Sequence, residues 1–89
     1  MTLLDLRRYA IRNRVRVGFR IDPAGECLVN EHGVLKIPSL VGAPNFQFDN
    51  SLTGVEQFVL APVQEPARTR EVSREQLQVL LGETPQPAA

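Results

Sequence analysis

This sequence has few of the side chains on which enzymes and metal centres depend. Its 89 residues include one cysteine, one histidine and no tryptophan. A metal site needs several His, Cys or carboxylate ligands that converge, and the carboxylates of this chain are scattered singly. A nucleophile needs a base within hydrogen-bond reach, whereas we expect Cys27 on a strand as a small buried residue and His32 in an exposed loop. The sequence therefore favours a protein that is not an enzyme and that has no metal and no cofactor.

Long apolar runs and net charge are also missing. A membrane span needs ~20 apolar residues in succession, no segment approaches that length, and the first residues lack the pattern of a secretory signal. The formal net charge is zero, whereas bulk attachment to nucleic acid or to a membrane surface needs a net basic surface. A single cysteine cannot form an internal disulfide. We therefore expect a cytoplasmic protein, bacterial in style, with no membrane partner.

The charge that is present is unevenly distributed along the chain. Residues 1–22 contain six arginines and two aspartates, a net charge of +4, whereas residues 23–66 contain one lysine and five carboxylates, a net charge of −4. Such a layout offers complementary patches for contact with a protein partner or with a second copy of the chain.

The clearest structural pattern lies between Arg14 and Asp22. Apolar residues alternate there with charged residues and glycine, Val15, Val17, Phe19 and Ile21 against Arg14, Arg16, Gly18, Arg20 and Asp22. A period of two predicts a strand with one buried face and one arginine-bearing face.

Local signals predict a helix at each end of the chain. The first covers Leu3–Arg12, because Thr2 and Asp5 have the spacing of a capping box and Asn13 suits a left-handed helix end. We expect its apolar stripe to consist of Leu3, Leu6 and Ala10, with Leu4 and Ile11 beside them.

The second helix begins after Ser73 and ends before Gly82. Ser73 and Gln76 form a second capping box, and Val72 can pack against Leu77 as a hydrophobic staple. The predicted buried stripe is Leu77, Leu80 and Leu81.

Three further strands complete the predicted sheet, over Glu26–Val29, Val34–Ile37 and Val55–Ala61. A four-residue hairpin loop, Asn30–Gly33, joins the first two and places Cys27 opposite Lys36. We therefore predict an α+β domain over residues 1–82. It has an N-terminal helix, a four-stranded and mainly antiparallel sheet made of a meander plus one strand after a long loop, and a short C-terminal helix, and residues 83–89 form a disordered tail.

Residues 38–54 form a long connection for so small a domain, and long connections are often functional. Phe46 and Phe48 share one side of an extended segment within it. They either close the open side of the core, as aromatic residues commonly do, or form an exposed pair that grips a partner.

The arginine-bearing strand face, with Arg14, Arg16 and Arg20 and with Arg7 and Arg8 upstream, has three interpretations. It is a solvated face whose arginines pair with neighbouring carboxylates such as Glu26, a protein interface, or a surface for RNA or single-stranded DNA. Phe19 lies on the opposite face from the arginines, so base stacking has little support.

We therefore predict a small interaction module that binds a protein partner or a second copy of itself, as in a homodimer. The predicted contact surface is the arginine face, and the 38–54 loop is a possible second contact. The alternative is a nucleic-acid-binding accessory domain.

Overall fold

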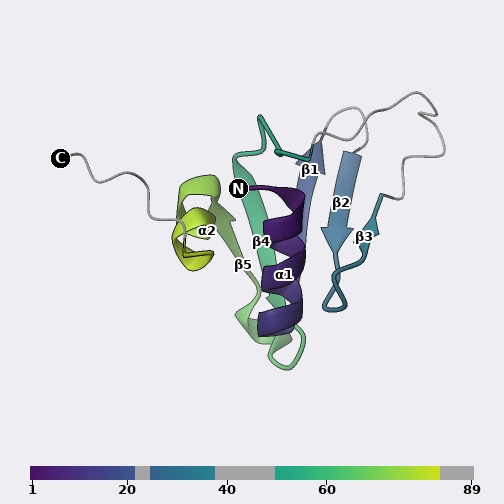
Figure 1. Ribbon diagram of the computed structural model, residues 1–89. Helices are drawn as coiled ribbons and strands as arrows, with labels where there is room; N and C mark the ends of the chain where they lie inside the picture. Colours follow the sequence, from purple (N-terminus) through teal and green to yellow (C-terminus); the bar gives the residue numbers. More distant parts are fainter. Residues whose placement is uncertain (22–24, 38–49, 83–89) are drawn as a thin grey trace.

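The computed structural model describes residues 1–21, 25–37 and 50–82. Its elements in chain order are α1 (Leu3–Asn13), β1 (Val15–Ile21), β2 (Gly25–Val29), β3 (Leu35–Lys36), β4 (Gln57–Pro62), the 3₁₀ turn η2 (Pro66–Arg68), β5 (Arg70–Ser73) and α2 (Arg74–Leu80). This is the predicted α+β arrangement (Figure 1).

Among the described residues, neither helix has the length and apolar composition of a membrane span. The predicted tail at 83–89 and the loop residues Phe46 and Phe48 lie outside the described residues.

The sheet has five strands in the order β3-β2-β1-β4-β5, and every neighbouring pair is antiparallel. The predicted count of four was wrong because it missed β5. That strand is only four residues long, Val72 is its one buried residue, and it runs directly into the cap of α2 at Ser73. Pairing with β4 rather than an apolar pattern of its own makes this segment a strand.

Helix α1 packs on one face of the sheet, against β1 and β2, and α2 lies at the β5 margin (Figure 1). The predicted capping box is present, since the Asp5 N–H donates to Thr2 Oγ1 and the Thr2 N–H donates to Asp5 Oδ2. Helix α1 ends one residue later than predicted, because Arg14 rather than Asn13 adopts the left-handed conformation, with φ 51°.

The core lies between α1 and the sheet. Leu3, Leu6 and Ala10 are buried as predicted, whereas Leu4 and Ile11 are more than half exposed, 52% and 54%. On the sheet side, Phe19 and Phe58 are direct cross-strand neighbours, and their ring centroids lie 5.9 Å apart. The remaining buried side chains of the strands are Val15, Val17, Cys27, Val29, Leu60 and Val72.

The β2–β3 hairpin has a register one residue away from the predicted one. The Asn30 N–H donates to the Val34 carbonyl, so Asn30 belongs to the ladder and the loop is one residue shorter than expected. The Asn30 side chain closes this loop by accepting from the N–H groups of His32 and Val34. In consequence Leu28, and not Cys27, lies opposite Lys36.

Helix α2 begins at the predicted capping box of Ser73 and Gln76, and Leu77 is fully buried. The rest of its predicted stripe is less buried, with Leu80 at 40% exposure and Leu81 partly covered. The guanidinium of Arg74 donates to the carbonyls of Ser51, Leu52 and Val55 and so ties α2 to the segment before β4. Strand β4 begins at Gln57 rather than Val55, because Val55 belongs to this buried turn.

Candidate interaction surface

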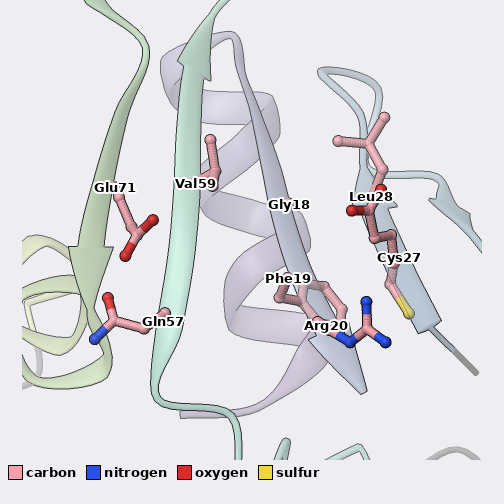
Figure 2. Close-up of a pocket in the computed structure, with 9 residues that line it drawn as sticks. Gly18, Phe19, Arg20, Cys27, Leu28, Gln57, Val59 and Glu71 are labelled. Carbon is pink, nitrogen blue, oxygen red and sulfur yellow. The ribbon is translucent and has the colours of Figure 1, made fainter. Parts of the chain in front are cut away.

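No helix of the described residues lies on the face of the sheet opposite α1, and we refer to this face as the open face. One complete row of directly paired residues crosses it from edge to edge, one residue from each strand, Lys36, Leu28, Gly18, Val59 and Glu71. Side chains of directly opposed residues share a face, so these five form one band, the central row. Figure 2 shows Leu28, Gly18, Val59 and Glu71 side by side, with α1 behind the sheet.

The open face is hollowed at Gly18. A depression of about 540 Å³ lies there, and Leu28 and Val59 flank it on the neighbouring strands (Figure 2). Val59 is 39% exposed, although its strand, β4, is paired on both sides. Phe19 and Cys27 border the depression, yet only 6% and 3% of their surfaces are accessible. The centre of the open face is therefore apolar and concave, and none of residues 1–21, 25–37 and 50–82 covers it.

Nothing within the described residues requires a glycine at position 18. Gly18 is not among the residues with positive φ, and the ladder runs through it without a bulge on both sides. A Cβ atom there would meet Val59 Cβ at 3.8 Å and the Cys27 carbonyl oxygen at 3.9 Å, which are ordinary contacts. The missing side chain at position 18, which creates the hollow, is therefore required neither by the backbone conformation nor by the packing around Gly18.

Charged residues of both signs lie on and beside the described part of the open face, and three of them, Arg20, Glu26 and Glu71, line the hollow itself. Arg16, Arg20 and Lys36 are basic, and Glu26, Glu31 and Glu71 are acidic. Arg20 lies directly opposite Glu26 on β2. Arg16 Nε donates to Glu31 Oε2 at 2.9 Å, so the ion pair of Arg16 is with Glu31 in the hairpin loop. This hydrogen bond lowers the pKa of Glu31 and raises that of Arg16.

The structure separates the residues that the sequence grouped as a basic interaction site. Arg16 and Arg20 lie on the open face, whereas Arg14 is at the junction after α1. Arg7 and Arg8 belong to α1 on the other side of the sheet, where Arg7 Nε donates to the Gly33 carbonyl at 2.7 Å. Arg7 is therefore placed to hold the hairpin against the helix.

Sequence reasoning missed the residues that shape the hollow, namely Leu28, Gly18 and Val59. The sequence offers one signal for the hollow. Gly18 is the uncharged residue in a series that otherwise consists of Arg14, Arg16 and Arg20 on the same face of the strand. The apolar walls come from strands that are distant in sequence, so they could be recognised only once the register was known.

The two residues with reactive side chains do not form a site. Cys27 is a buried free thiol, and burial raises its pKa. The His32 side chain is 77% exposed in the hairpin loop. Within residues 1–21, 25–37 and 50–82, no group of three or more His, Cys, Asp or Glu side chains is arranged to hold a metal ion.

Comparison with known proteins adds no relative to this description. No family model matches the chain, and neither does any curated protein or solved structure. What the chain does must therefore be inferred from its own residues.

Proposed function

We propose that this protein is a small protein–protein interaction module and that the open face of its sheet is the interface. The observation that carries the proposal is the uncovered hollow at Gly18 between Leu28 and Val59. The uncovered face of a two-layer domain is usually polar, and exposed apolar patches mark contact sites. Here an apolar centre is surrounded by charged residues, which is the usual anatomy of a protein interface.

Gly18 supports the same proposal. Glycine in the interior of a strand lowers stability, because it loses more backbone entropy on folding and has no side chain to pack. A central strand retains it where the chain bends or where another molecule approaches closely. The ladder at Gly18 is regular, so the close approach of a partner is the explanation that we favour.

Two features favour a protein over a nucleic acid as the partner. The described charged residues that line the hollow are one arginine and two glutamates, so the surface has no excess positive charge for phosphates. Of the described aromatic residues, Phe19 and Phe58 are buried in the core and Tyr9 lies on α1, so none offers a stacking surface on the open face. As part of the same proposal we place the protein in the cytoplasm, where its single thiol stays reduced.

Site-specific photocrosslinking in the cells of origin tests this proposal. Val59 and Val79 are both exposed valines, the first on the open face and the second on α2. We expect p-benzoylphenylalanine at position 59 to give one defined protein adduct that is absent with the same group at position 79. Adding Gly18→Leu, which fills the hollow, should abolish this adduct. No protein adduct at position 59, or adducts to nucleic acid, would overturn the proposal.

A further inference from the structure

We infer that the partner of the open face is the open face of a second copy of this chain. This inference rests on the proposed function, since it names the occupant of the same surface. It follows from the order of side chains along the central row, which is basic, apolar, glycine, apolar, acidic, from Lys36 on β3 to Glu71 on β5.

That order is self-complementary. Sheets that pack face to face keep their strands within about 30° of each other. A two-fold axis running along β1 past Gly18 then reverses the row in the second copy. Lys36 of each copy meets Glu71 of the other at both margins, and Leu28 meets Val59 on either side of the axis. An axis running along the row would instead set Lys36 against Lys36 and Glu71 against Glu71.

Gly18 has a direct role in this arrangement. It occupies the middle of the row, so it lies on the axis and faces Gly18 of the second copy. With no side chain there, the two central strands can approach closely enough for the flanking Leu28 and Val59 side chains to meet in the hollow. Arg16 and Arg20 are on β1 as well, so each lies along the axis and faces the same arginine of the second copy. Glu31, paired with Arg16, and Glu26, opposite Arg20, supply the negative charge that offsets this repulsion.

The size of the face predicts a weak dimer. Five strands about 4.8 Å apart and rows about 3.3 Å apart give roughly 300–400 Å² on each copy. Stable specific interfaces bury about 800 Å² on each partner. We therefore expect an equilibrium between monomer and dimer that shifts with concentration.

Sedimentation velocity of the purified full chain, from low micromolar to millimolar concentration, tests the inference. We expect dimers that dissociate on dilution, and about tenfold weaker association for Lys36→Glu and for Glu71→Lys, because each reversal replaces two attractive pairs with repulsive ones. The double variant Lys36→Glu/Glu71→Lys should return to within about threefold of the original affinity. Glu75→Lys, the same substitution on α2, serves as the control and should not change association.

Rescue in the double variant identifies the contact as one between copies. Lys36 and Glu71 are four strand spacings apart within one chain, roughly 19 Å, which exceeds the screening length of about 8 Å at physiological salt. Monomers at every concentration, or a dimer that the double variant fails to restore, would overturn the inference. If Val59 then crosslinks to a different protein, the proposed function stands and only the second copy as its partner is wrong.

Discussion

The two faces of this sheet are made by the same strands but differ in what covers them. On one face, Val17 and its neighbours on β1 and β2 are buried beneath α1. On the other, Val59 is accessible beside a glycine. Helix α1 together with Leu77 of α2 closes one side of the sheet, and the described elements of the 89-residue chain supply no helix for the other. The contrast teaches that the alternating pattern assigned the buried face correctly, while the open face departs from the polar surface that such a pattern implies.

The largest effect should come from placing the same charge on each face in turn. Val17 is fully buried and Val59 is 39% exposed, so Val17→Asp and Val59→Asp form a matched pair. Val17→Asp buries a carboxylate without a partner and should cost about 4 kcal/mol or more, enough to unfold so small a domain. Val59→Asp should change stability by less than about 1 kcal/mol. Circular dichroism melts measure both, and an unfolded Val59→Asp with a stable Val17→Asp would mean that the faces are reversed.

A second pair of variants compares two glycines. Gly33 has φ +77°, and a Cβ there would lie 2.7 Å from Ile11 Cδ1, whereas Gly18 has room for a methyl group. Gly33→Ala should therefore destabilise the fold by about 1–3 kcal/mol. Gly18→Ala should leave stability unchanged or raise it by up to about 1 kcal/mol, since alanine loses less entropy on folding. Urea unfolding decides between these outcomes, and a strongly destabilising Gly18→Ala would contradict the assignment of this glycine to the surface.

The features that were predictable from sequence are the local ones. Both capping boxes, Thr2 with Asp5 and Ser73 with Gln76, depend on residues three positions apart, and the alternation in β1 is visible in the chain itself. These signals correctly predicted both helices and the main strand.

The features that escaped prediction depend on pairing between distant segments. Strand β5 exists because it pairs with β4, and the hairpin register shifted because the Asn30 N–H joined the ladder. The same reason applies to the candidate site. Charge density along the chain grouped Arg7 and Arg8 with Arg16, although the sheet lies between them, and it gave no hint that Leu28 and Val59 flank Gly18.

Cys27 provides a chemical probe of the covered face. The thiol is buried, and burial raises its pKa, so little thiolate is present at neutral pH. We expect alkylation of the folded protein by iodoacetamide to be slower than that of the urea-unfolded chain by about two orders of magnitude, because reaction requires opening of the structure. Cys27→Ala should cost about 1 kcal/mol and leave self-association intact. Rapid labelling of the native protein at neutral pH would show that this face is less well covered than the contacts indicate.

The smallest effect concerns the ion pair beside the open face. Arg16 lowers the pKa of Glu31 chiefly through the hydrogen bond between Nε and Oε2, and both groups are accessible to solvent. Because the folded pKa of Glu31 is lower than its unfolded value, the pair stabilises the fold at pH above the unfolded value. This contribution is lost as pH falls through the folded pKa.

An NMR titration of the Glu31 carboxyl group measures this shift directly. Arg16→Ala should return the pKa of Glu31 toward its ordinary value and leave the melting temperature at neutral pH almost unchanged, because exposed pairs contribute little to stability. Arg14→Ala is the matched control, since Arg14 is an exposed arginine two residues earlier and is not the partner of Glu31 in the ion pair. If Arg14→Ala raised the pKa of Glu31 as much as Arg16→Ala, the general positive field of the segment would control this carboxylate, and the contact between Arg16 and Glu31 would have no special part in it.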